Sequence, residues 1–350
     1  MKKLLAKLRR KDNSGATSRI TNETVAEHRE RILAGGRKFK YPVQYVRHRL
    51  VFNAIIISIA ALAAVIAVGC WQLYPAQNTS VFVYRVTKVL PLPVASVDGQ
   101  LVPYSDYLMK YLSSVHYLEQ KEQVSLKSDD GKRQIAFIKE QSMTDAIADA
   151  YAQKVANSLG VTVSDTELES FLKMQRQSSD GEVSQQTYDA VILDYYGWTP
   201  DEYRYATKSK LLRQKVGYEV DKAASKVSAS VGDQLKADGA NMQSIAASAN
   251  SSSGSQVTYG ASGLVPKTNQ DGGLAAEAAK LEKGKISSVI KSTTGDGYYY
   301  VRLLDSNDTQ VSYEYVQIPL TQFKKDLESV SKANKINRFI TIVAPATTTQ

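Results

Sequence analysis

The residue types that most enzymes use for acid–base or metal chemistry are scarce in this 350-residue chain. It has three histidines, His28, His48 and His116, and a single cysteine, Cys70. Cys70 lies inside a long apolar run, and only His116 follows that run. A Cys/His metal cluster and a disulfide framework are therefore excluded, and we predict no metal and no cofactor. Most histidine-dependent catalysis is excluded for the same reason.

The remaining candidates for catalysis or metal binding are weak. Ser262 and Lys267 are spaced as a serine–lysine dyad would allow, but such a pair arises by chance in many loops. Asp129–Asp130 and the pair Asp305/Asp308 lack the further oxygen ligands of a calcium loop, so solvated turns are the expected interpretation. The sequence therefore favours binding over bond-making chemistry.

The basic character of the chain is confined to its first 49 residues. The whole chain has a net charge of +9, whereas residues 1–49 carry a net charge of +10 and the remainder is close to neutral. A phosphate-binding groove in the folded part is not supported, so we predict no nucleic-acid partner. The charge acts instead as a topology signal for the apolar run that follows.

That apolar run predicts one membrane-spanning helix. No charged residue occurs between Arg49 and Arg85, and the stretch from Val51 to Trp71 is nearly all apolar. About 20 such residues cross the hydrocarbon core of a bilayer. The basic side faces the cytoplasm by the positive-inside rule. We therefore predict a single-pass cell-membrane protein with a cytoplasmic N terminus and extracytoplasmic C-terminal domains.

Two alternatives concern this segment. A cleaved signal peptide is disfavoured, because the run is longer than a usual signal core and no small-x-small site follows it. Lipidation of Cys70 stays open, because residues 67–70 faintly resemble a lipobox.

Helical signals dominate residues 94–220. A turn at Asp98-Gly99 predicts a short hairpin, and a helix with helical apolar spacing is expected from about 132 to a stop at Gly160. Ser164 with Glu167 forms a capping box, and Thr199 precedes a proline at a first helical position. The hairpin resembles the opening of the SurA/PrsA/PpiD group of extracytoplasmic folding factors. Residues 152–167 and 196–215 resemble later helical boundaries of the same group.

The C-terminal third shows a succession of helices and strands. Helical signals cover 223–235, 242–249 and 274–283, and strands are expected at 259–265, 285–290 and 298–304. The glycine-rich strand, the Gly-x-Ile-Ser segment at 284–287 and the closing strand at 297–299 resemble a parvulin-type, PpiC-like peptidyl-prolyl isomerase domain. The family's first strand is not legible before residue 223. We hypothesise that residues 311–319 fill its place in the sheet.

The family's polar active-site residues are not matched. Its acidic or thiol position falls on Ala261 and one histidine falls on Tyr299, while Gln317 would stand for the other histidine. Isomerase activity is therefore uncertain, and the catalytic residues are unknown. The resemblance implies candidate peptide-pocket residues, which are Ala261, Leu264, Val265, Tyr299 and Gln317. The tyrosines and a tryptophan of the helical part form a candidate chaperone surface, comprising Tyr107, Tyr111, Tyr196, Trp198 and Tyr203.

The predicted fold class is α+β and mainly helical, with one N-terminal transmembrane helix, a helical domain similar to the SurA N-terminal domain, and a small parvulin-like sheet with helices. The predicted segments are a basic cytoplasmic arm (1–49), a transmembrane anchor (50–74), a linker (75–93), the SurA-N-like helical domain (94–220), the parvulin-like domain (221–345) and a tail (346–350). The leading functional interpretation is a membrane-anchored chaperone that binds unfolded or newly exported polypeptides, with the lipid bilayer as its other partner. An active parvulin-family isomerase and an envelope adaptor without chaperone activity are the alternatives.

Overall fold

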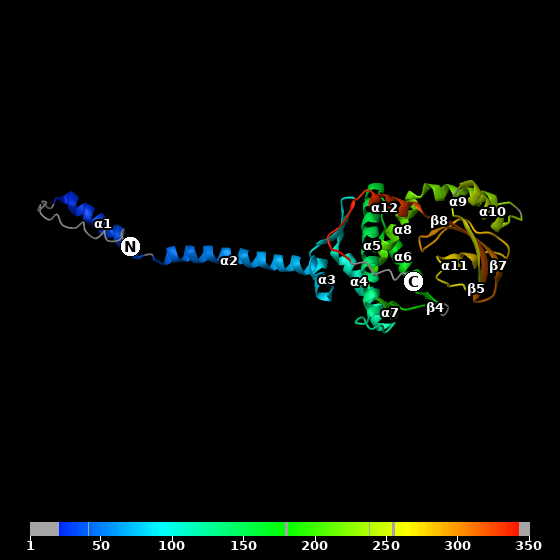
Figure 1. The fold of residues 1–350 in the computed structure, drawn as a ribbon, viewed down its shortest axis with the longest axis horizontal. Helices are drawn as coiled ribbons and strands as arrows, with labels where there is room; N and C mark the ends of the chain where they lie inside the picture. Colours follow the sequence, from blue (N-terminus) through cyan, green and yellow to red (C-terminus); the bar gives the residue numbers. More distant parts are fainter. Residues whose placement is uncertain (1–20, 41, 179–180, 238, 254–255, 343–350) are drawn as a thin grey trace. The chain divides into compact units, whose positions relative to one another are not determined.

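The computed structural model describes residues 21–342 except 41, 179–180, 238 and 254–255. The first 20 residues of the predicted arm and the predicted tail at 346–350 lie outside these ranges. The chain divides into two compact units, residues 1–72 and 73–350. The first unit consists of helices α1 (Asn22–Lys40) and nearly all of α2 (Pro42–Leu73). Figure 1 shows the elements along the chain.

Helix α2 contains the predicted anchor. Its stretch His48–Leu73 is 26 residues long, apolar enough to cross a membrane, and not buried against protein. A helix of this length rises about 39 Å, which exceeds the roughly 30 Å of a bilayer core. The helix is consistent with a signal anchor.

The predicted irregular linker is wrong in its second half, where a helix forms. Helix α3 (Val81–Val89) begins after Ser80, whose side chain accepts a hydrogen bond from the Val83 amide. The prediction of an irregular segment depends on the prolines at 91 and 93, but these prolines lie after the last helical residue. They end the helix without preventing it.

After α3, the second unit continues with the predicted hairpin and five helices of the described chain. The elements are β1 (Pro93–Val97), β2 (Gln100–Pro103), α4 (Tyr104–Gln120), α5 (Asp129–Leu159), α6 (Asp165–Gln175), β3 (Gln177–Ser178), β4 (Gly181–Glu182), α7 (Gln185–Tyr196) and α8 (Pro200–Val220). The hairpin turn has positive φ at both Asp98 and Gly99, as its Asp-Gly sequence predicts. The capping box at Ser164 is present as predicted, and Gly160 ends α5 in the left-handed conformation.

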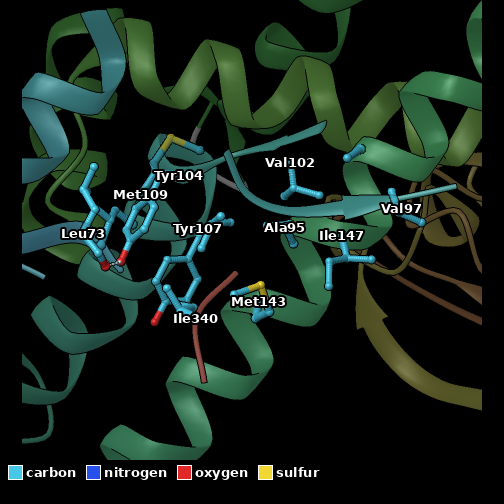
Figure 2. Close-up of a cluster of buried hydrophobic side chains, with 14 of the residues drawn as sticks. Leu73, Ala95, Val97, Val102, Tyr104, Tyr107, Met109, Met143, Ile147 and Ile340 are labelled. Atoms are coloured by element: carbon cyan, nitrogen blue, oxygen red, sulfur yellow. Dashed lines mark hydrogen bonds between the residues drawn. The ribbon is translucent and has the colours of Figure 1, made fainter. Parts of the chain in front are cut away.

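The core of this helical part joins the hairpin to α4 and α5 (Figure 2). Tyr104, Tyr107 and Met143 are almost completely buried there. The Tyr104 hydroxyl donates to the Leu73 carbonyl at 2.9 Å, which satisfies a polar atom that would otherwise be costly to bury. The cluster also contains Ile340, from the far end of the chain.

The end of the chain returns to this helical core. Helix α12 (Gln322–Lys332) packs against α8, and β9 (Ile336–Arg338) pairs antiparallel with β1 in a three-stranded sheet of order β2-β1-β9. Arg338 binds both carboxylate oxygens of Glu140 on α5 at 2.7 Å. Residues from 322 onward, which the sequence assigns to the C-terminal domain at 221–345, therefore pack with the helical part. No local feature of the sequence indicates this long-range pairing.

The intervening residues form a four-stranded antiparallel sheet with helices on both faces. Its elements are α9 (Lys222–Leu235), α10 (Met242–Ser253), β5 (Thr258–Pro266), α11 (Leu274–Ala278), β6 (Ile290–Lys291), β7 (Gly297–Ser306) and β8 (Gln310–Pro319), in strand order β5-β8-β7-β6. Helices α9 and α10 cover the face that carries Tyr298 and Val316, and α11 covers the face that carries Tyr299 and Val301. Helix α11 is shorter than the predicted helix 274–283.

Residues 311–319 belong to the sheet, as the hypothesis about this segment requires. Strand β8 pairs with β5 on one side and with β7 on the other, so it occupies an inner position in the sheet. The predicted class, mainly helical α+β with a small antiparallel C-terminal sheet, agrees with the structure.

Candidate functional site

A partly exposed aromatic stack marks the turn between α7 and α8. Gly197 ends α7 with a φ of 67°, and Thr199 caps the next helix, so the two residues fix a tight corner. The rings of Tyr196 and Trp198 stack there, with centroids 5.1 Å apart and planes 17° apart. Tyr196 is 43% exposed, and the His116 ring lies against Gly197. The corner thus presents flat apolar surface to the outside.

Three adjoining cavities follow α4 past this corner, and we call them together the α4 groove. The first is about 380 Å³ and lies between α3, the start of α4 and the start of α8. The second, about 540 Å³, shares Tyr84, Met109 and Glu202 with the first and extends to the aromatic corner. The third, about 390 Å³, continues past Trp198 towards α5.

Helix α4 supplies the floor of the groove through a stripe beside its core-facing side. Ser105, Met109, Leu112, His116 and Glu119 recur at three- and four-residue spacing and line the first two cavities. The distance along the axis from 105 to 119 is about 21 Å at 1.5 Å per residue. An extended peptide rises about 3.3 Å per residue, so the groove matches about six residues of unfolded chain.

The wall opposite the aromatic corner is held rigidly by Glu202. This carboxylate accepts hydrogen bonds from the Tyr84 hydroxyl at 2.7 Å, the Lys88 ammonium at 3.0 Å and the Thr199 amide at 2.9 Å. Burial opposes ionisation of Glu202, but these donors outweigh it and lower its pKa to about 2. Burial and the bond to Glu202 in turn raise the pKa of Tyr84 well above its usual range. Glu202 therefore stays charged and ties α3 to α8.

The groove has no arrangement suited to nucleophilic or metal chemistry among the described residues. Asp106 accepts from the Tyr205 hydroxyl at 3.0 Å, and burial raises the pKa of Asp106. His116 pairs with the Asp194 carbonyl at 3.0 Å. No group of three or more potential metal ligands occurs in the described part of the chain. What the groove offers is apolar and aromatic contact area with a few polar groups at its edges.

The structure sorts the predicted chaperone surface into two sets. Tyr196 and Trp198 line the α4 groove, and Tyr203 lies behind them with its hydroxyl 2.9 Å from that of Tyr188. Tyr107 and Tyr111 are buried instead, and their placement on a surface is corrected. Tyr107 belongs to the core that α4 shares with α5 and the hairpin, and the Tyr111 ring stacks on that of Tyr107.

The five predicted peptide-pocket residues do not come together on one face of the sheet. Tyr299 pairs with Gln317 across β7 and β8, on the face covered by α11, and Val265 packs against the same cluster. Ala261 pairs with Glu314 and Leu264 with Ser312, which lie an odd number of residues from Gln317 and so project from the other face. An irregularity at residues 262–263 separates the two pairings.

Tyr299 and Gln317 belong to a saturated polar cluster. Asp296 accepts from the Tyr299 hydroxyl at 2.5 Å and from the Gln317 amide at 3.2 Å, while Thr294 donates to its other oxygen at 2.6 Å. Burial opposes ionisation, but the hydroxyl donors lower the pKa of Asp296 overall. Tyr299 is buried, so the cluster closes on itself and leaves little apolar surface for a substrate.

Sequence reasoning missed much of the groove, including Tyr84, Met109, Leu112 and Leu193. A signal for two of them existed in the helical spacing Met109, Leu112, His116, which lies beside the core stripe of α4. Tyr84 lies on α3, in the segment that the sequence predicts to be a linker. Leu193 precedes the aromatic corner and is 55% exposed.

Comparison with known proteins decides what this part of the chain is similar to. Residues 44–217 match the family model of the SurA-like N-terminal domain. All the residues that line the α4 groove lie within that match. The match indicates a chaperone-like folding factor, a class whose SurA-like domains are extracytoplasmic and bind unfolded polypeptides.

The matched family model does not extend to the C-terminal sheet, and no family model of a parvulin domain matches there. No curated protein and no solved structure gave a match. The resemblance to the SurA group is thus carried by the SurA-like domain alone.

Proposed function

We propose that this protein is a membrane-anchored extracytoplasmic chaperone that holds unfolded or newly exported polypeptides in the α4 groove. The observation that carries the proposal is the stack of exposed Tyr196 on half-buried Trp198 in a groove long enough for about six extended residues. Aromatic rings supply large contact area that is tolerant of sequence, which suits a binder of many clients. The SurA-like match over the same residues supports it.

The location of the groove outside the cytoplasm follows from charge and length. The net +10 before the apolar helix favours a cytoplasmic N terminus, and the single candidate span among the described residues then directs residues after 73 outwards. We propose that the C-terminal sheet contributes shape and surface to this chaperone and little or no isomerase activity. The predicted pocket residues are split between its two faces, which supports that part of the proposal.

A holding assay tests the proposal. The full chain, reconstituted in lipid nanodiscs, is mixed with chemically unfolded rhodanese, and light scattering records aggregation. We expect the chain to suppress aggregation at near-equimolar ratios, whereas empty nanodiscs do not. An adaptor without chaperone activity would leave the scattering unchanged, and that result would contradict the proposal.

Matched variants locate the binding surface. Leu193→Ser with Tyr196→Ser removes a leucine (55% exposed) and a tyrosine (43% exposed) from the groove. Tyr259→Ser with Leu264→Ser removes the same two residue types, 38% and 57% exposed, from β5 of the C-terminal sheet. Losing about 1 kcal/mol of apolar contact per side chain lowers affinity for an aromatic-rich peptide about 30-fold in the groove variant. An equal loss of peptide affinity in both variants would show that the groove is not the binding site. Circular dichroism checks that both variants remain folded.

A further inference from the structure

Helix α3 has an apolar face that its own fold does not use. Val83, Tyr84 and Thr87 are buried against the helical core. At 100° per residue, Phe82, Val86 and Val89 lie together within about 60° of arc on the side away from those three. Phe82 is 75% exposed and Val89 is 80% exposed. A helix on the surface of a water-soluble fold carries polar residues on that side.

Leaving this face in water is costly. Burial of a Phe or Val side chain is favourable because it removes apolar surface from water, and these three side chains do not gain that free energy within the fold. The groove does not use them, because its α3 wall is made of Val81, Tyr84, Arg85 and Lys88. Among the described residues, no core cluster includes Phe82, Val86 or Val89.

Chain connectivity restricts what can cover this face. The apolar span ends at Leu73 and α3 begins at Val81. Even a fully extended connection, with eight Cα–Cα steps from residue 73 to residue 81, reaches only about 27 Å, and α3 therefore cannot leave the neighbourhood of the membrane surface. A second copy or a client would have to compete there with a bilayer that is always present.

The charges around the face suit a lipid surface as well. The sequence contains no aspartate or glutamate from residue 31 to residue 97. The charged residues of α3 are Arg85, which is exposed, and Lys88, whose ammonium binds Glu202 at 3.0 Å. An exposed cation beside an apolar stripe is a feature of helices that lie in the membrane interface, with the cation at the level of anionic headgroups.

The geometry points to α3 as an interfacial membrane helix, with Phe82, Val86 and Val89 inserted among the lipid acyl chains. The occupant of this face is the same bilayer that holds α2. The inference concerns the placement of the α3 face and not the binding of clients. It can therefore hold or fail independently of the chaperone activity.

Spin-label accessibility in vesicles tests the inference. The full chain carrying Cys70→Ser receives one labelled cysteine at position 82, 86 or 89, and is reconstituted in phosphatidylcholine–phosphatidylglycerol vesicles. A matched control label replaces Phe137, an apolar residue of α5 that is 59% exposed. We expect collision rates of the three α3 labels with oxygen to exceed those with a water-soluble nickel chelate at least threefold, and the reverse at 137.

Two results would overturn the inference. Labels at 82, 86 and 89 that meet the nickel chelate as readily as the label at 137 would place the face in water. Labels protected from both oxygen and the chelate would place it against protein, such as a second copy. A companion variant, Phe82→Ser with Val89→Ser, should move a label at 86 into water while α2 keeps the chain in the vesicles.

Discussion

The helical part and the C-terminal sheet are both rich in tyrosine, but they use it in opposite ways. In the sheet, Tyr299 and Tyr313 are buried, and each hydroxyl donates to a carboxylate, Asp296 at 2.5 Å and Asp271 at 2.6 Å. At the aromatic corner of the helical part, Tyr196 instead stacks on Trp198 and stays largely exposed. Tyrosine in the sheet therefore stabilises structure, whereas tyrosine in the groove is free to contact another molecule.

One buried aspartate lies at the junction of these two regions. The chain passes there from the helical part to the sheet and later returns. Asp221 is 2% exposed and caps α9 by accepting from the Ala224 amide at 2.8 Å. Its other oxygen accepts from the amides of Thr321 and Gln322, at 2.7 and 3.0 Å, at the start of α12. The carboxylate thus fastens the outgoing and returning chain to each other.

Asp221→Ala should produce the largest loss of stability. It removes one helix cap and leaves two further part-buried amides without an acceptor, so we expect a cost of about 3 kcal/mol. Urea unfolding of the full chain in nanodiscs, followed by far-ultraviolet circular dichroism, measures it. Ser164→Ala, which removes an exposed cap on α6, is the matched control and should cost about 1 kcal/mol. Equal costs would mean that the joint between the regions is not rigid.

A smaller effect distinguishes the wall of the groove from a similar cap elsewhere. Glu202 and Glu167 both close capping boxes, and both have their pKa lowered to about 2. For Glu167 the main cause is the hydrogen bond from Lys215, followed by those from Ser164. The Glu202 side chain is only 12% exposed and that of Glu167 is 49% exposed, so solvent screens the second far more.

Glu202→Gln should therefore destabilise the chain by about 1 kcal/mol, and Glu167→Gln by about 0.3 kcal/mol. A lowered pKa means that the stability is present above the ordinary pKa of 4.5 and is lost as the pH falls towards 2. Acid titration of unfolding should show a smaller loss of stability between pH 4.5 and 2 in Glu202→Gln than in the wild type. Equal destabilisation in Glu202→Gln and Glu167→Gln would contradict the role of the Glu202 carboxylate in holding α3 to α8.

The features that can be predicted correctly from the sequence depend on residues within one helical turn of each other. The capping box at Ser164, the N-cap at Thr199 and the glycine stop at 160 depend on hydrogen bonds between near neighbours. Local chemistry of this kind is visible in a single sequence.

The features that sequence missed depend on contacts between distant segments. Tyr107 and Tyr196 look alike as residues, and only the packing of α5 and the hairpin on α4 makes one buried and the other exposed. The pairing of β9 with β1 joins residues more than two hundred positions apart. The predicted pocket failed because the register of β5, with its irregularity at 262–263, turns Ala261 and Leu264 to the face opposite Tyr299.

The smallest expected effect concerns prolyl isomerisation. We expect neither the helical part nor the C-terminal sheet to catalyse this reaction. The reaction has a barrier of about 20 kcal/mol and needs a water-poor pocket that fits the twisted amide. Asp296, Tyr299 and Gln317 already satisfy one another, and Tyr299 is buried. We expect the full chain in nanodiscs to leave the refolding rate of a proline-limited ribonuclease unchanged.

Asp296→Asn tests this expectation against a matched neighbour. Asp271→Asn disrupts an equivalent tyrosine–carboxylate pair, that of Tyr313, on the same face of the sheet. Both variants should lower the thermal midpoint by a few degrees through the loss of a charge-assisted hydrogen bond, and neither should change the refolding rate. Acceleration by the wild type that disappears in Asp296→Asn and persists in Asp271→Asn would show that the cluster is catalytic. The sheet would then be a second functional region, and the contrast with the groove would be one between two activities.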